Sequence, residues 1–323
     1  MSLIVTGTIG IDTVETPGGG RHEDLLGGSA VYFAAAASFY TNTRMVAAVG
    51  DDFPSAFMDT LKSFEGLDLA GLEVRSGSKT FRWGGKYHED MDHRDTLFTD
   101  LGVLEEAPPV VPESFKDSEV VFLANSHPMV QMGMLDQVTN PTLSVADTMD
   151  LWIDIAKPEL TQLLGKVDGL VLNFDEAEQF TGHRNPVSAG KHLLELGPRF
   201  VVIKKGEHGC ILVHRDGICA LPAYPTENVV DPTGAGDSFA GGLMGRLSAR
   251  GGHDLGSYES VREAVARLAA KTRSRVLESR RRHYCAASLR VVAPGAEDAW
   301  QKETRPFIPP ALRGRDASRW CGV

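Results

Sequence analysis

The chain has 323 residues, of which 42% are apolar, and its formal net charge is −10. This length and composition indicate a globular protein with one large α/β domain carrying an insertion, or with two modest domains. No apolar stretch approaches the roughly 18 residues that a membrane span needs, and the first residues lack the charged and apolar regions of a signal peptide. We therefore expect a cytoplasmic protein with no membrane partner.

Acidic and basic residues are unevenly distributed. Residues 271–323 hold 12 Lys or Arg against 5 Asp or Glu, so the body before them is acidic. An acidic body argues against nucleic acid as a partner, because Lys and Arg side chains that neutralise phosphates dominate that affinity. The run Arg280-Arg-Arg-His283 fits either a basic contact patch or a solvated helix face. The four cysteines have no metal-ligand spacing, so we expect free thiols.

Short apolar runs alternate with helical periodicity through most of the chain. We expect strands at 3–7, 45–49, 119–123, 142–146, 168–172 and 199–204. We expect helices near 28–40, 54–64, 129–138, 174–181, 187–196 and 236–250. This alternation is typical of a mainly parallel sheet covered by helices on both faces, in which ligands bind at the carboxyl ends of the strands.

Residues 11–26 and 77–101 interrupt this alternation. They have the pattern of polar strands in hairpins, with aromatic side chains in the second segment. Together they would form a small sheet beside the main domain. Such a sheet could close as a lid over a bound ligand and exclude water. The alternative is an edge extension of the main sheet with a partly buried apolar face.

Two polar features lie near the N-terminus. Asp12 follows the first predicted strand, and Gly27-Gly28 opens a helix of small residues. A carboxylate and exposed backbone groups are what a ligand rich in hydroxyls requires. A turn aspartate and a closely packed glycine pair are the structural alternatives.

Asn173 and Glu176 are placed at a strand end and in the first turn of the following helix. Mg²⁺ prefers oxygen ligands and keeps several waters, so Glu176 could anchor it, partly through water. The alternative is a capping box, in which the Asn and the Glu three residues later satisfy backbone N–H groups.

The run from Asp231 to Gly245 combines an anion-binding backbone with a carboxylate. Small residues at 234–236 permit a tight turn and expose N–H groups at the start of a helix, which favours an anion. Asp237 would repel a phosphate there, which favours a chemical role as the base that accepts a proton from an attacking hydroxyl. An N-capping turn is the structural alternative.

These segments, in their order over roughly residues 4–250, resemble the ribokinase-like, or PfkB, family of carbohydrate and nucleoside kinases. The run at 231–239 resembles the family signature Asp-Thr-x-Gly-Ala-Gly-Asp-x-Phe, with Pro232 in place of the common Thr. Asn173-Phe-Asp-Glu176 resembles its Asn-x-x-Glu element, and 201–209 is similar to its strand and Gly-x-x-Gly turn near the nucleotide. A Walker A motif is absent from the sequence.

The resemblance implies a three-layer α/β/α kinase domain over 1–270, with lid segments at about 11–26 and 77–101. It implies transfer of the γ-phosphoryl group of ATP to an acceptor hydroxyl, with Asp237 as general base and the N–H groups of Gly234, Ala235 and Gly236 stabilising the transferred group. Residues expected to bind the acceptor are Asp12, Gly27, Gly28, Tyr32, Phe81 and Trp83. Residues expected to bind the nucleotide are Asn173, Lys204, Gly206, Gly209 and Thr233.

The resemblance also implies Mg²⁺ near Glu176, a loop at Asp231 for a monovalent cation such as K⁺, and a homodimer formed through the lid. Two further positions depart from the family pattern. Lys204 stands where Thr is usual, and its side chain could reach a phosphate or point into solvent. Tyr32 stands where Asn is common, and its ring could stack on a ligand or pack internally.

The acceptor stays open between two classes. The aromatic residues Tyr32, Phe81, Trp83 and Tyr87 favour a nucleoside, and a ribose-type or fructose-type sugar is the alternative. A non-catalytic ligand-binding member of the fold is a third hypothesis. After Ala270 the resemblance ends in the basic region 271–323, so the residues that contact adenine are unassigned.

Overall fold

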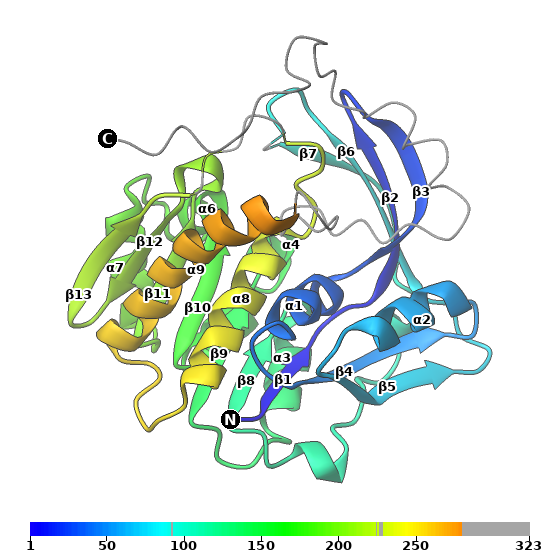
Figure 1. The fold of residues 1–323 in the computed structure, drawn as a ribbon, viewed down its shortest axis with the longest axis horizontal. Helices are drawn as coiled ribbons and strands as arrows, with labels where there is room; N and C mark the ends of the chain where they lie inside the picture. The colour runs from blue at the N-terminus through cyan, green and yellow to red at the C-terminus, as the bar shows by residue number, and fades with distance from the viewer. Residues whose placement is uncertain (92, 224, 226–228, 280–323) are drawn as a thin grey trace, which may run out of the picture.

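The protein is described from a computed structural model, which covers residues 1–279 except 92, 224 and 226–228. In this part of the chain, one large sheet has the strand order β13-β12-β11-β10-β9-β8-β1-β4-β5 (Figure 1). Its strands are β1 (Leu3–Thr6), β4 (Thr43–Gly50), β5 (Leu67–Arg75), β8 (Val120–Leu123), β9 (Leu143–Asp147), β10 (Gly169–Asn173), β11 (Phe200–Lys204), β12 (Cys210–His214) and β13 (Gly217–Leu221). The strands from β11 to β5 pair in parallel, and β12 and β13 pair antiparallel at one edge.

Apolar side chains of the central strands alternate between two cores. Leu3 and Val5 of β1 lie in one core, and Ile4 between them lies in the other. Val120 and Val121 of β8 divide in the same way. A strand that buries both faces must be apolar throughout, which explains the short unbroken apolar runs.

Helices cover both faces of the large sheet. One face is covered by α1 (Ser29–Ala37), α2 (Ser55–Ser63), α8 (Ala235–Arg250) and α9 (Tyr258–Ser279). The other is covered by α3 (Pro128–Leu135), α4 (Asp150–Ile155), α5 (Lys157–Leu164), α6 (Phe174–Thr181) and α7 (Pro186–Glu195). The structure is therefore the expected three-layer α/β/α arrangement.

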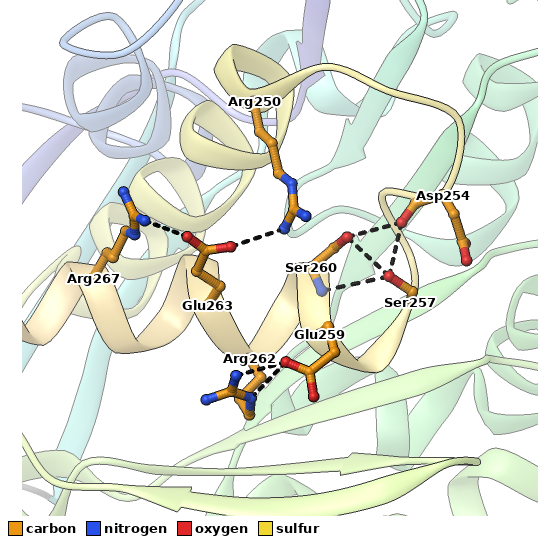
Figure 2. Close-up of polar contacts among 8 residues, drawn as sticks. All are labelled: Arg250, Asp254, Ser257, Glu259, Ser260, Arg262, Glu263 and Arg267. Atoms are coloured by element: carbon orange, nitrogen blue, oxygen red, sulfur yellow. Dashed lines mark hydrogen bonds and ion pairs between the residues drawn. The ribbon is translucent and has the colours of Figure 1, made fainter.

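The helices α8 and α9 are joined by polar contacts (Figure 2). The Ser257 and Ser260 hydroxyls each donate to the Asp254 carbonyl at 2.9 Å, which fixes the start of α9. Arg250 of α8 lies 3.2 Å from Glu263 of α9. This pair is solvent-exposed, so it orients the helices more than it stabilises the protein.

A second, four-stranded sheet stands beyond one end of the large sheet (Figure 1). It contains β2 (Gly10–Thr16), β3 (Gly20–Gly27), β6 (Phe81–Tyr87) and β7 (Arg94–Asp100), in the order β3-β2-β6-β7. Its own small core contains Val14, Leu25 and Tyr87. The two polar segments that interrupt the sequence pattern therefore form one separate sheet, and not an edge extension of the main one.

The expected strands and helices are all present, with ends shifted by a few residues. The expectations omitted β5, the hairpin of β12 and β13, and the helices α4 and α5. The helix α9 passes residue 270 and extends to Ser279, the last described residue. The arginine run at 280–283 and the rest of the C-terminal region lie outside the described residues. Among the helices that are described, none is long and apolar enough to cross a membrane.

Candidate active site

A large cavity lies at the carboxyl ends of the parallel strands and extends under the small sheet. Asp12, Trp83, Glu176, Lys204 and Asp237 all line it, although they come from widely separated parts of the chain. Its volume of about 2460 Å³ exceeds the ~300–1,000 Å³ of an ordinary ligand pocket. The cavity therefore has room for two substrates side by side.

The helix α8 points its N-terminus into this cavity. Gly234 caps the helix with φ of 74°, and a Cβ atom there would lie 2.2 Å from Tyr32 Cγ. Only glycine permits both that conformation and that approach. Asp231 Oδ1 accepts a hydrogen bond from Thr233 N at 3.0 Å, which stabilises the turn before the helix. Tyr32 is thus buried against the loop, which agrees with the alternative that its ring packs internally.

Of the three N–H groups expected to bind an anion, that of Ala235 already has a partner. It donates to the Pro232 carbonyl at 3.0 Å within the turn. Gly236 follows it, and Asp237 lies in the first helical turn. A helix N-terminus attracts an anion through its exposed N–H groups and its dipole, so this end of the cavity suits a phosphate.

The Asp237 carboxyl lies among other charged side chains of the cavity. Burial and the nearby Asp147 carboxylate together raise its pKa to about 7, against the opposing effect of Lys204. A base with a pKa close to neutral accepts a proton efficiently near pH 7.

Asp12 is a buried carboxyl group in another part of the same cavity. It lies in β2 and is 4% exposed, and its Oδ1 has no hydrogen-bond partner in the described structure. Burial, together with Asp231 and Asp237, raises its pKa to about 7. A buried acceptor left unpaired is costly, so the geometry suits a ligand that supplies a donor, such as a sugar hydroxyl.

The glycine pair makes room for this carboxyl group. A Cβ atom at Gly27 would lie 1.8 Å from Asp12 Oδ2. Gly28 has φ of 100°, and a Cβ atom there would lie 2.4 Å from the Thr8 carbonyl oxygen. Gly27 therefore allows β3 to approach Asp12 closely, and Gly28 allows the start of α1 to approach the Thr8 backbone.

The small sheet supplies aromatic walls to the cavity. Phe81 packs near Gly10, and the Trp83 ring lies 5.8 Å from the Arg94 guanidinium. The Thr233 hydroxyl donates to Tyr87 Oη at 3.0 Å. This hydrogen bond joins the small sheet directly to the loop before α8, and only the folded structure brings these two residues together.

Asn173 and Glu176 form the capping box that was the structural alternative for them. Glu176 N donates to Asn173 Oδ1 at 2.8 Å, and Asn173 N donates to Glu176 Oε2 at 2.7 Å. Burial raises the pKa of Glu176 to about 7, although Lys204 opposes the rise. The box holds the Glu176 carboxyl at the cavity wall, so capping does not prevent contact with a ligand.

Lys204 and Asp147 complete this side of the site. Lys204 Nζ lies 3.8 Å from Asp147 Oδ1, and both side chains are largely buried. Lys204 does not point into solvent. Sequence reasoning missed Asp147, yet it directly follows the strand expected at 142–146, so the rule that ligands bind at strand ends would have found it.

The oxygen ligands beside Lys204 suit Mg²⁺ only in part. The described residues include no group of three or more His, Cys, Asp or Glu that could hold a metal ion by themselves. Glu176 offers a buried carboxylate, and Mg²⁺ is commonly bound by one or two carboxylates with waters and substrate phosphates. The residues therefore fit an ion that arrives with a nucleotide.

The turn between β11 and β12 borders the same cavity. Gly206 and Gly209 have φ of 53° and 90°, and a Cβ atom at Gly209 would lie 2.0 Å from the Leu221 carbonyl oxygen. Glycine is thus required for this turn to approach the hairpin. Both residues line the cavity beside Lys204.

The chain is similar in sequence and in fold to known kinases. The chain is 30% identical over 254 residues to a cytidine kinase of Thermococcus kodakarensis, which covers 77% of this chain and 89% of that protein. A nucleoside kinase of Burkholderia thailandensis, solved in complex with inosine, is 18% identical with a TM-score of 0.65, covering 83% of this chain and 90% of that one. A putative ribokinase II of E. coli, solved with ATP and Mg²⁺, is 19% identical with a TM-score of 0.66, covering 82% and 91%.

The model of the pfkB family carbohydrate kinases matches residues 13–277, which include most of the small sheet, the loop before α8 and most of α9. Enzymes of this family are phosphotransferases that act on hydroxyl groups and use ATP. With the expected fold, the buried carboxyl groups and the helix N-terminus in one cavity, the chain belongs to the pfkB family of carbohydrate kinases.

Proposed function

We propose that this enzyme transfers the γ-phosphoryl group of ATP to a hydroxyl of a nucleoside, with Asp237 as the general base. The observation that carries this proposal is the position of Asp237 between two unlike ends of one cavity. One end has the α8 N-terminus and Lys204, and the other has the unpartnered carboxyl oxygen of Asp12. An anionic donor and a hydroxyl-bearing acceptor can therefore meet at Asp237.

The acceptor hydroxyl would lie beside Asp237 and Asp12. As its oxygen forms a bond to phosphorus and the bond from phosphorus to ADP breaks, its proton passes to Asp237. The N–H groups at Gly234, Ala235 and Gly236 would stabilise charge on the phosphoryl group, with Ala235 first releasing its bond to Pro232. Asp12, Gly27 and Gly28 would hold the acceptor and limit its orientation.

On the nucleotide side we assign Asn173, Lys204, Gly206, Gly209 and Thr233 to the binding of ATP. Glu176 would hold Mg²⁺ through water, and the ion would neutralise triphosphate charge when bound. Asp231 would contribute to a loop for K⁺. A homodimer through the small sheet remains a prediction that a measurement of mass in solution can test.

The aromatic walls favour a nucleoside over a free sugar. Phe81 and Trp83 line the cavity that also contains Asp12, and a flat base can stack on such rings. The cytidine kinase and the inosine-bound nucleoside kinase among the similar proteins support the same choice. A ribose-type or fructose-type sugar is the second candidate, because Asp12 suits either diol.

The test is release of ADP with a panel containing cytidine, inosine, adenosine, ribose and fructose. We expect turnover with at least one nucleoside that exceeds turnover with either sugar. Asp237→Asn should fold and bind ATP but lower kcat by about 10³-fold or more, since a positioned base contributes ~10²–10⁴-fold. The control is Asp117→Asn, which changes an exposed carboxylate.

Each part of the proposal can fail separately. Turnover with sugars alone would make the acceptor assignment wrong. Turnover unchanged in Asp237→Asn would remove this residue from the role of base. Acceptor binding without ADP release from the unaltered protein would leave a non-catalytic ligand-binding protein of the same fold.

A further inference from the structure

A lysine and an aspartate meet at the carboxyl edge of the large sheet. Asp147 ends β9 and Lys204 ends β11, with β10 between them. In the sheet register Val171 of β10 pairs with Asp147, and Asn173 pairs with Lys204. The Lys204 side chain therefore reaches across β10 to lie 3.8 Å from Asp147 Oδ1.

Asp147 is held rigidly. Its Oδ1 accepts a hydrogen bond from Thr148 N at 2.9 Å. The Asp147 carbonyl accepts from Gln131 Nε2 at 2.9 Å, and the same amide nitrogen donates to the Leu123 carbonyl at 2.9 Å. Gln131 is buried, and it ties the ends of β8 and β9 together. The carboxylate thus offers a fixed point of negative charge to Lys204.

The Lys204 ammonium lies where a cation is otherwise unfavourable. A Cβ atom at Gly236 would come within 2.7 Å of Lys204 Nζ, so the ammonium packs against the first turn of α8. A helix N-terminus carries partial positive charge and repels a cation. Burial lowers the pKa of Lys204, but Asp147, Glu176 and Asp237 outweigh this effect and keep the side chain charged.

The same place would repel a nucleotide if Lys204 were neutral. Asp147, Glu176 and Asp237 all lie near the α8 N-terminus, and their charge opposes that of a triphosphate. A lysine held among these carboxylates places a positive charge on the side that faces Gly236. This arrangement requires the ammonium to be kept at a defined position, because a retracted side chain would leave the carboxylates exposed to the phosphate.

We propose that Asp147 is a positioning residue that holds the Lys204 ammonium against the N-terminus of α8, where this ammonium contacts the phosphoryl group in transfer. The inference rests on the proposed kinase function and deepens it. Lys204 keeps its proton and donates hydrogen bonds to phosphoryl oxygens. The acceptor proton goes to Asp237, and ADP leaves with the electron pair of the broken bond. Asp147 does not touch either substrate.

Steady-state kinetics with ATP and the best nucleoside test this assignment. Lys204→Met should lower kcat by about 10²–10³-fold, the loss typical of removing one stabilising donor, with little change in the nucleoside KM. Asp147→Asn should lower kcat by about tenfold and raise the ATP KM, because the ammonium is retained but poorly placed. The double variant should be no worse than Lys204→Met, since Asp147 acts only through Lys204.

The chain offers a matched control in the exposed pair of Lys166 and Asp136, 3.0 Å apart. Lys166→Met, Asp136→Asn and their combination should leave kcat within about twofold, as expected for a surface pair. Thermal unfolding of every variant separates loss of function from loss of folding. If Lys204→Met fails to fold because Asp147 is left buried and unpaired, the double variant replaces it, as it removes both charges.

The inference is overturned if Lys204→Met, or the double variant in its place, keeps kcat within about threefold of the unaltered enzyme. It is also overturned if the losses of Asp147→Asn and Lys204→Met multiply in the double variant, because independent sites add in free energy. Failure of the proposed function is recognised differently, since the unaltered protein would then release no ADP with nucleosides.

Discussion

The two ends of the cavity handle negative charge in opposite ways. At the acceptor end, Asp12 is buried with an unpartnered oxygen, and the neighbouring groups that raise its pKa are carboxylates. At the phosphate end, Asp147 and Glu176 are equally buried, but Lys204 lies among them. The first arrangement suits neutral hydroxyl donors, and the second suits an anion. One enzyme can therefore discriminate two substrates by charge before shape is considered.

Asp12→Ala should have the largest effect, because it removes the buried carboxyl group that distinguishes the acceptor end from the phosphate end. We expect kcat/KM for the best nucleoside to fall about 10²–10³-fold, since hydrogen bonds to a charged group contribute ~1.5–3 kcal/mol each. The ATP KM should stay nearly constant, because Asp12 lies at the other end of the cavity. Steady-state kinetics with each substrate varied in turn will measure both constants.

A deoxynucleoside sharpens this prediction. If Asp12 binds a ribose diol, the unaltered enzyme should prefer the nucleoside to its 2′-deoxy form, and Asp12→Ala should lose most of that preference. An equal preference in both proteins would show that Asp12 does not recognise the diol.

The next largest effect concerns how the free energy of unfolding depends on pH. The pKa of Asp12 is about 7 in the folded protein against its ordinary 3.8, so its contribution to folding is complete below pH 3.8 and is lost as pH rises through 7. From pH 5 to pH 8 this amounts to about 2–3 kcal/mol, at ~1.4 kcal/mol per pH unit. Asp12→Asn should remove this loss.

Urea unfolding at several pH values will measure it. The free energy of unfolding of the unaltered protein should fall more steeply with pH than that of Asp12→Asn, whereas Asp117→Asn should follow the unaltered protein. Parallel curves for the Asp12 variant would contradict a raised pKa. Asp237 and Glu176 also titrate near pH 7, but they are present in both proteins and largely cancel in the difference.

The smallest effect is expected where the small sheet meets the loop before α8. Tyr87→Phe removes the hydrogen bond from Thr233, which is worth about 1 kcal/mol, so kcat/KM should fall about fivefold. Tyr258→Phe is the matched control, because it loses a similar bond to the Ile218 carbonyl far from Asp237. If both variants lose stability alike and neither loses activity, the bond to Thr233 is structural only.

The sequence was most informative where function depends on local geometry. Gly234, Gly236 and Asp237 form one short run, and Gly27 with Gly28 forms another, so their spacing already indicated a helix N-terminus and a close approach. The sequence also indicated Asn173 and Glu176, but the same spacing predicts both a Mg²⁺ site and a capping box. The structure shows the capping box, and it leaves the carboxyl group on the cavity wall.

Other features could not be found because they depend on distant segments. Asp147 and Lys204 are 57 residues apart in the sequence and meet only because β9 and β11 both flank β10. Tyr87 and Thr233 meet only because the small sheet stands over the loop before α8. The edge strands β5 and β13 were missed as well, since partly exposed strands lack the unbroken apolar runs that marked the central ones.

The sequence by itself determined the central parallel strands, the helices around them and the family resemblance, because these follow from periodicity and from motifs whose residues are adjacent. Only the tertiary structure decided the charge state and partners of the site residues. A pKa depends on burial and on charges that arrive from other strands, so the values near 7 for Asp12 and Asp237 exist only once the chain has folded.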